Sequence, residues 1–183
     1  MAYKPKQVAI IGAGPVGALA GLYFSHAGWS VAVYELRGGT HLLPLSLSPQ
    51  LMLTQPSFPD LRLPENRALG SGKSINLALS ERGITGLRNI GDKGNAVLHR
   101  VLDDTIPMVG RMIHSGKVGE PGVAQAYDNV QGRFIRSADR AQLNRQLLDA
   151  LEERADVKLC FGYKMTRLNL NGVEGAEVQL VKT

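Results

Sequence analysis

The stretch from Val8 to Arg37 constrains the fold of this chain more than any other part of the sequence. A short apolar run at residues 8–11 leads into the segment Gly12-Ala13-Gly14-Pro15-Val16-Gly17, and a helix-like segment follows. Gly28 ends that segment, and a second run rich in β-branched residues ends on Glu35. This order of strand, glycine turn, helix, strand and acidic residue is typical of a dinucleotide-binding unit.

Each residue type in this pattern has a physical reason. Gly12 permits the tight turn out of the first strand, and Gly14 leaves room for a pyrophosphate to approach the backbone. Gly17 lets the helix pack closely on the sheet, and the start of the helix attracts phosphates through its N–H groups and its dipole. Glu35 is placed to accept hydrogen bonds from a ribose diol, and its charge argues against NADP in this site. The motif by itself does not separate FAD from NAD.

The bulk composition favours a globular chain that is not specialised for nucleic acid. A length of 183 residues suits one domain with a real core. The net charge is +5, but the basic residues are scattered, which favours a solvated basic surface over a nucleic-acid partner. The single cysteine, Cys160, and four isolated histidines provide neither a disulfide framework nor a metal-ligand spacing. Because no apolar run is long enough to span a membrane and no signal peptide is visible, we expect a soluble chain.

Residues 38–59 have a different texture from the rest of the chain. This segment has no charged residue, four prolines and six leucines, without a steady period. Prolines at this density exclude a long helix or a central strand. We therefore expect an irregular insert that is not part of the evolved fold.

The remaining sequence predicts further helices and strands. Ser80 is the expected N-cap of a helix that ends at Gly91, and Pro107 is expected to stop a second helix. A strand at 109–114 is expected to pair with Arg133–Ile135 across a loop at 116–122. The other predicted elements are an extended piece at 74–78, the second helix at 96–103, a helix opened by residues 137–140, a strand at 157–161, and an antiparallel pair at 163–170 and 176–181 around Asn171-Gly172.

These elements predict an α/β fold of the Rossmann type. Its parallel sheet has the strand at 30–34 in the middle, flanked by the strands at 7–11 and 157–161, because right-handed crossovers favour this winding. A small antiparallel layer follows at the end of the chain. The fold class is thus a Rossmann-like domain, and the sequence stops within what looks like a sheet.

Four blocks of sequence resemble the kynurenine 3-monooxygenase family of FAD-dependent aromatic hydroxylases. They are Lys73–Gly83 (KSINLALSERG), Ile106–Met108, Arg111–His114 and Ser137–Leu148 (SADRAQLNRQLL). The resemblance runs from about Val8 to Leu168 and is fungal in style. It implies hydroxylation of L-kynurenine to 3-hydroxykynurenine with FAD, NADPH and O2, in tryptophan degradation and NAD biosynthesis.

The resemblance also assigns roles to individual residues. Val16 matches a residue of the glycine loop that lies against FAD, and Arg37, like Glu35, matches the segment that holds the adenosine ribose. Ala78 matches a backbone contact to FAD, Arg140 the arginine that meets its phosphate and ribitol region, and Met165 a contact on the adenosine side. From the residues alone, a surface arginine is the alternative interpretation of Arg37, and a salt bridge to Asp139 or Glu153 is the alternative for Arg140.

Two further residues match positions that contact the substrate. Arg111 matches the arginine that pairs with the amino-acid carboxylate, and Tyr127 matches a substrate-contacting tyrosine, with an alignment that slips by one residue. From spacing alone Arg111 is as well explained as an ordinary edge arginine, and Tyr127 as a loop aromatic. No side chain in this chain is expected to act as an acid–base catalyst, since the cofactor carries the chemistry.

The chain departs from the family pattern in two ways. The segment 38–59 is extra, and the second FAD motif, most of the substrate domain and a C-terminal membrane-anchoring segment are missing. We therefore interpret residues 1–183 as the N-terminal part of an FAD-binding domain that is inactive alone. The family implies a location on the cytosolic face of the mitochondrial outer membrane. Two alternatives stay open: an NAD(P)-binding dehydrogenase or reductase, and a non-catalytic nucleotide-binding module.

Overall fold

The computed structural model describes residues 6–36, 76–170 and 176–183. The chain divides into two compact units, one formed by residues 1–73 and 144–183 and the other by residues 74–143. The predicted insert at 38–59, the predicted turn at Asn171-Gly172 and the site candidate Arg37 all lie outside the described residues.

A parallel sheet organises the first unit. Its strands are β1 (Gln7–Ile11), β2 (Ser30–Glu35) and β8 (Val157–Phe161), in the order β1-β2-β8. Both pairings are parallel, with Val8 opposite Val31 and Val31 opposite Val157. The predicted strands and their order are therefore confirmed. In β2, Val31 is 2% exposed and Val33 is 1% exposed, as expected of the central strand of a parallel sheet.

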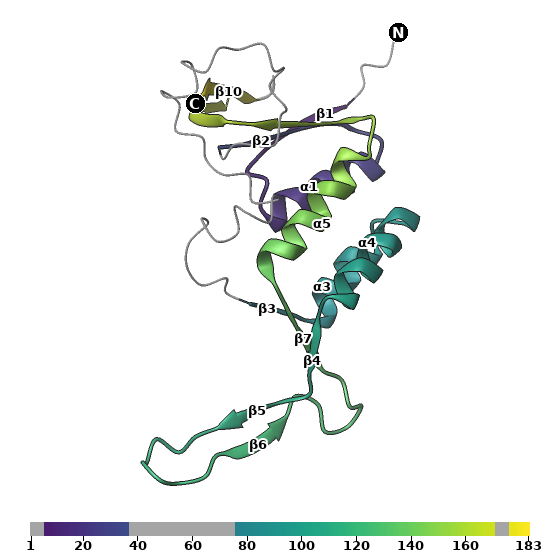
Figure 1. Ribbon diagram of the computed structural model, residues 1–183. Coiled ribbons are helices and arrows are strands. Elements are labelled where there is room, and N and C mark those ends of the chain that lie inside the picture. Colours follow the sequence, from purple (N-terminus) through teal and green to yellow (C-terminus); the bar gives the residue numbers. More distant parts are fainter. Residues whose placement is uncertain (1–5, 37–75, 171–175) are drawn as a thin grey trace, which may run out of the picture. The chain divides into compact units, whose positions relative to one another are not determined.

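Two helices pack together beside this sheet (Figure 1). They are α1 (Pro15–His26) and α5 (Arg140–Glu152), of which residues 144–152 belong to the first unit. Gly21 of α1 lies so close to α5 that an added Cβ would be 3.0 Å from Leu151 and 3.5 Å from Val33 of β2. Leu22, Leu147 and Leu151 are buried in this core. The close approach therefore depends on a residue without a side chain at this point of α1.

An antiparallel pair completes the described part of the first unit. β9 (Tyr163–Leu170) pairs with β10 (Ala176–Lys182), with Tyr163 opposite Lys182, which confirms the predicted antiparallel layer. Gly162, at φ +75°, separates β9 from β8. The ring of Tyr163 meets that of Tyr34 in β2 edge to face, with centroids 5.7 Å apart, so this layer contacts the parallel sheet.

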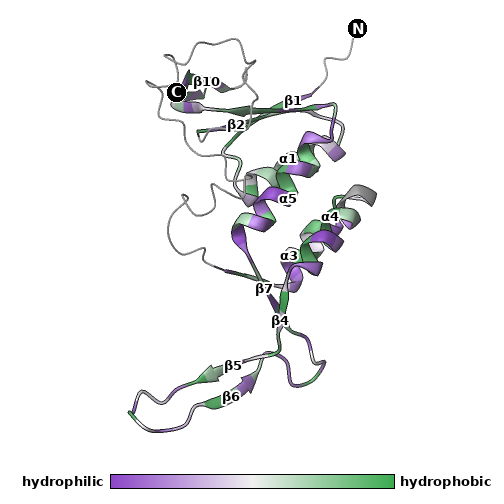
Figure 2. Cartoon of the chain, in the orientation of Figure 1, coloured by the Kyte–Doolittle hydropathy of each residue, from purple (hydrophilic) through white to green (hydrophobic). Residues whose placement is uncertain are grey.

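The second unit combines two helices with two small antiparallel sheets. One sheet has the order β3-β7-β4, and the other is a two-stranded ribbon of β5 and β6. The elements are β3 (Leu77–Leu79), α3 (Glu81–Arg88), α4 (Asp92–Asp103), β4 (Ile106–Met108), β5 (Gly110–Ile113), β6 (Val123–Ala126) and β7 (Ile135–Ala138). Both α3 and α4 carry hydrophobic as well as hydrophilic residues (Figure 2). Their buried residues Ile84, Leu87, Val97, Leu98 and Val101 contribute to the core of this unit.

The predicted partner of the strand at 109–114 is wrong. β5 pairs with β6, with Arg111 opposite Gln125, whereas β7 is the central strand between β3 and β4. The sequence of β6, Val-Ala-Gln-Ala, does not alternate regularly between apolar and polar residues, so no pattern marks this strand, and all four residues are exposed. A partner that is closer along the chain also has a lower entropy cost of closure.

The predicted helix boundaries also need correction. Residues 137 and 138 belong to β7, and α5 begins at Arg140. Ser80 is the N-cap of α3, as predicted, but its side chain makes no capping hydrogen bond. Gly91 does not end α3, which ends at Arg88; at φ +90° it is instead the N-cap of α4, which begins at Asp92. Pro107 lies in β4, at the edge of its sheet, where a missing N–H is tolerated.

Candidate functional site

The turn between β1 and α1 depends on its glycines. Gly12 has φ +103°, a conformation that side chains disfavour, and its N–H donates a hydrogen bond of 2.7 Å to Tyr34 O. A Cβ on Gly17 would be 1.9 Å from Gly12 O, which no real contact allows. By contrast, a Cβ on Gly14 would meet nothing within 4 Å. Internal packing therefore requires Gly17, while open space lies beside Gly14.

The start of α1 is suited to an anion. Gly14 is the N-cap and has no capping side chain, and no acidic residue lies in the first turn. The N–H of Ala18 donates to Gly14 O at 2.9 Å, so the N–H groups of Val16 and Gly17, which precede it, have no acceptor within the helix. Val16 is 83% exposed at this end. Helix N-termini with such N–H groups bind phosphates.

Glu35 links the end of β2 to the glycine turn. Glu35 is only 8% exposed, and its Oε2 accepts a hydrogen bond of 2.8 Å from the N–H of Ala13. The carboxyl ends of the parallel strands β1 and β2 meet here, which is where open α/β sheets bind ligands. The Glu35–Ala13 bond was not predicted from the sequence. The spacing between the glycine motif and the acid at the end of the second strand is the signal that points to it.

The other candidates for FAD binding lie on separate elements. Met165 lies in β9 of the first unit and is 40% exposed. In the second unit, Ala78 of β3 is opposite Ser137 of β7, and Arg140 follows β7 as the first residue of α5. The structure thus brings Gly12, Gly14, Val16, Gly17 and Glu35 together at one turn, whereas Ala78 lies on a strand and Arg140 at the start of a helix.

Arg111 and Tyr127 lie on the ribbon of β5 and β6. The side chain of Arg111 donates two hydrogen bonds to Gln125 Oε1, from Nε at 2.9 Å and from Nη2 at 2.8 Å. The N–H of Tyr127 donates to Val109 O at 3.1 Å, which extends the pairing by one position beyond Gly110 and Ala126. The structure therefore brings the two predicted substrate residues together on one ribbon.

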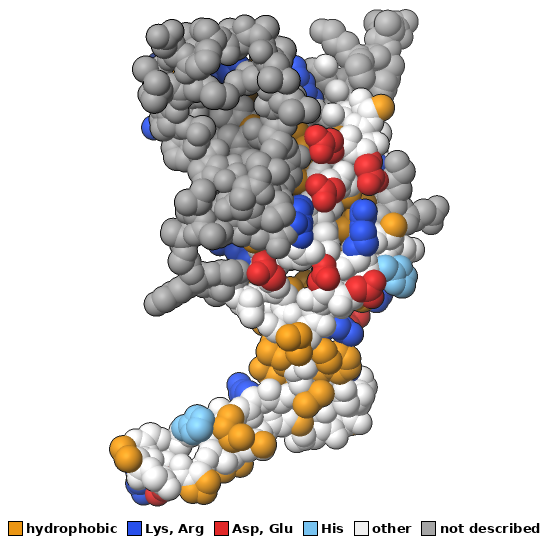
Figure 3. Space-filling model, viewed as in Figure 1, with side chains coloured by type: hydrophobic (Ala, Val, Ile, Leu, Met, Phe, Trp, Pro, Cys, Tyr) orange, Lys and Arg blue, Asp and Glu red, His pale blue; other side chains and the backbone are white. Residues whose placement is uncertain are grey.

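This ribbon also exposes apolar side chains. Hydrophobic groups gather near β4 and along the ribbon in Figure 3. Met112 is 55% exposed and Val123 is 69% exposed, while Tyr127 is 43% exposed. Met112 lies on one face of the ribbon, and Val123 and Tyr127 lie on the other, so both faces expose apolar side chains.

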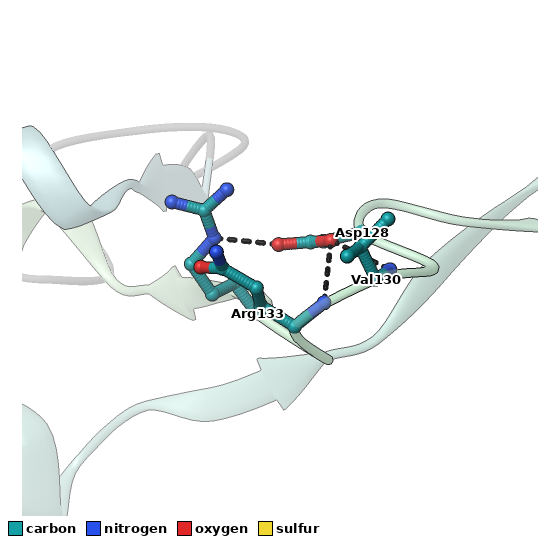
Figure 4. Close-up of polar contacts among 4 residues, drawn as sticks. Asp128, Val130 and Arg133 are labelled. Carbon is teal, nitrogen blue, oxygen red and sulfur yellow. Dashed lines mark hydrogen bonds and ion pairs between the residues drawn. The ribbon is translucent and has the colours of Figure 1, made fainter.

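A tight turn begins directly after Tyr127. Asp128 Oδ1 accepts hydrogen bonds of 2.9 Å from the backbone N–H groups of Val130 and Gln131, and Oδ2 pairs with Arg133 Nε at 2.5 Å (Figure 4). The backbone N–H of Gln131, the Arg133 side chain and the N–H of Val130 hold the pKa of the Asp128 carboxyl well below its ordinary value. This turn therefore relies on an ionised Asp128.

The Asp128 turn should loosen in acid. The pKa of the Asp128 carboxyl is lowered in the folded state. Its ionised form therefore contributes to stability above the ordinary pKa of 3.8, and this contribution is lost as the pH falls through the folded pKa. In a titration downward from about pH 6, the amide signals of Val130 and Gln131 should begin to shift only below about pH 4. The variant Asp128→Asn should lack this transition. Identical titrations for both chains would contradict the role of the carboxylate.

Comparison with solved structures identifies the class of fold. The p-nitrophenol 4-monooxygenase PnpA of Pseudomonas putida matches 97% of this chain and 39% of its own with a TM-score of 0.63 at 15% identity. The flavin-dependent monooxygenase PieE, solved with FAD and substrate, matches 99% of this chain and 27% of its own with a TM-score of 0.65 at 16% identity. The chain therefore has a fold found in flavin-dependent monooxygenases.

Comparison with curated sequences shows which proteins this chain is similar to. The kynurenine 3-monooxygenase of Aspergillus terreus is 47% identical over 170 residues, and that of Aspergillus oryzae is 46% identical over 172 residues. Each match covers 91% of this chain but 29% of the relative, so the chain spans less than a third of their length. No family model matches the sequence. The resemblance to kynurenine 3-monooxygenases is thus confirmed over about nine tenths of this chain.

A separate observation concerns membranes. Among the helices of residues 6–36, 76–170 and 176–183, none combines the length and the apolar character needed to cross a bilayer.

Proposed function

We propose that this chain supplies the first FAD-binding unit and part of the substrate-binding surface of an L-kynurenine 3-hydroxylase. The observation that carries the proposal is the buried Glu35 carboxylate at the glycine turn, in a sequence 47% identical to a kynurenine 3-monooxygenase. The reaction converts L-kynurenine, NADPH, H+ and O2 to 3-hydroxykynurenine, NADP+ and water.

The residues of the first unit fit the adenosine and pyrophosphate part of FAD. Open space beside Gly14 and the N–H groups of Val16 and Gly17 suit a pyrophosphate. A carboxylate accepts on both oxygens, so the bond from Ala13 to Glu35 Oε2 is compatible with further bonds from a ribose diol. Arg37, Ala78, Arg140 and Met165 are proposed as further FAD contacts. When bound, FAD supplies the redox chemistry, with NADPH as the reductant.

Arg111 is proposed to bind the carboxylate of the substrate, with Tyr127 beside it. A guanidinium matches a carboxylate in charge and in bidentate geometry. Kynurenine carries both a carboxylate and an aromatic ring, so an arginine near a tyrosine and exposed apolar side chains suits it chemically. The resemblance further supports a location on the cytosolic face of the mitochondrial outer membrane, which fractionation of the source cells tests.

Spectroscopy and turnover test the proposal against its alternatives. We define the completed protein as this chain joined to the segment of the Aspergillus terreus relative that the chain does not match. A bound-flavin absorbance spectrum is expected, and its absence would favour an NAD(P)-binding dehydrogenase. Hydroxylation of kynurenine is also expected, and flavin binding without turnover would favour a non-catalytic nucleotide-binding module.

Substitution of Glu35 separates its structural role from its binding role. Glu35→Ala removes the acceptor of the Ala13 N–H, so we expect the free energy of unfolding to fall by about 1–3 kcal/mol. FAD affinity of the completed protein should fall by a similar free energy because the ribose acceptor is lost. Glu35→Gln keeps a side-chain oxygen and should lose less of both. Urea unfolding and flavin fluorescence measure the two effects, and unchanged flavin content in Glu35→Ala would contradict the ribose assignment.

A further inference from the structure

The contact between Arg111 and Gln125 has a specific geometry. The two residues are directly opposite each other in β5 and β6, and Gln125 Oε1 accepts from both Nε and Nη2 of Arg111. These two nitrogens form one edge of the planar guanidinium. The other bidentate edge carries one N–H from each Nη. Among the residues that the structure describes, the side-chain hydrogen bonds of Arg111 are the two to Gln125.

Hydrogen bonds to one edge of a guanidinium also fix the orientation of its other edge. Its nitrogens are rigidly coplanar, so an acceptor on the Nε–Nη2 edge fixes the direction of the Nη1–Nη2 edge. That second edge is the one that forms two parallel hydrogen bonds to a carboxylate. Gln125 is also neutral, so it orients the arginine without cancelling the charge that attracts an anion. A glutamate at the same position would compete with the ligand for that charge.

The position of Tyr127 indicates where the ligand lies. Residues directly opposite in a ribbon lie on the same face, as do residues two apart along one strand. Arg111 is opposite Gln125, and Tyr127 follows Gln125 by two residues, with its N–H still paired to Val109 O. Arg111 and Tyr127 therefore share one face of the ribbon, at diagonal positions that long side chains can bridge.

We propose that Gln125 is a positioning residue that aims Arg111 at the carboxylate of the substrate. This inference rests on the proposed function, because it takes Arg111 as the carboxylate-binding residue. Gln125 does not itself touch the substrate. It acts by removing rotational freedom from the guanidinium before the ligand arrives, which lowers the entropy cost of binding.

The test compares two substrates in the completed protein. Gln125→Met keeps the length of the side chain and removes the acceptor. We expect the KM for kynurenine to rise about 3- to 10-fold, with kcat unchanged. The amine analogue of kynurenine that lacks the carboxylate should show the same KM in the variant as in the parent. The matched control Gln131→Met, an exposed glutamine in the turn after β6, should change neither KM.

The outcomes separate this inference from the proposed function. Arg111→Met should raise the KM for kynurenine more than Gln125→Met does, and a normal KM in Arg111→Met would refute the carboxylate assignment itself. A raised KM in Arg111→Met with a normal KM in Gln125→Met would overturn the positioning role alone. Equal losses for both substrates in Gln125→Met would also overturn it, because they would indicate a general structural effect.

Discussion

Replacing Gly17 by alanine should lower the free energy of unfolding of the first unit by about 3 kcal/mol. The added Cβ would be 1.9 Å from the backbone oxygen of Gly12, so neither a rotamer change nor a flexible neighbour can relieve the clash. Either α1 must move away from β1 or the glycine turn must deform. The single tryptophan, Trp29, packs against Phe24 of α1, with tilted rings whose centroids are 5.2 Å apart. Urea unfolding followed by its fluorescence therefore reports on this unit.

Gly14→Ala is the matched control for this experiment. Gly14 has φ −70° and open space around its Cβ position, so alanine should change the free energy of unfolding by less than about 1 kcal/mol. In the completed protein the same methyl group should still weaken FAD binding, because it occupies the space proposed for the pyrophosphate. Equal stability of Gly17→Ala and the parent chain would show that the close contact between α1 and β1 is not required.

The 183-residue chain by itself should show no kynurenine-dependent oxidation of NADPH. Hydroxylation requires a site that excludes water, whereas the ribbon that carries Arg111 and Tyr127 is exposed, with Tyr127 at 43% exposure. One ion pair near a surface contributes about 0–1 kcal/mol, which is too little to retain kynurenine. We also expect weak or no retention of FAD, since the described glycine turn accounts for the adenosine and pyrophosphate part alone.

The completed protein is the positive control for this prediction. It should retain FAD and produce hydroxykynurenine, measured by chromatography alongside NADPH consumption. The Arg111→Met variant of the completed protein serves as the negative control for substrate binding. Hydroxykynurenine produced by the isolated chain, in amounts that scale with its concentration, would refute the requirement for further structure around the ribbon.

Local sequence was sufficient to predict the architecture of the first unit. In β1, α1 and β2 the apolar periodicity, the glycine spacing and the terminal Glu35 all favour the same structure over consecutive residues. The place of β8 next to β2 was also predictable, because a right-handed crossover leaves few alternatives for a parallel strand. The family resemblance rested likewise on contiguous blocks, and the relatives at 47% and 46% identity support it.

Long-range pairing decided what the sequence left open. The four residues of β6, Val-Ala-Gln-Ala, have no alternating pattern that distinguishes a strand from a loop, so the predicted partner of β5 was the segment Arg133–Ile135 instead. The Glu35–Ala13 bond and the Arg111–Gln125 pair likewise join residues 22 and 14 positions apart. The sequence by itself determined the fold of the first unit, because each local pattern there is consistent with only one structure. Tertiary structure decided the contacts between side chains from different strands, because their geometry depends on a register that no single segment specifies.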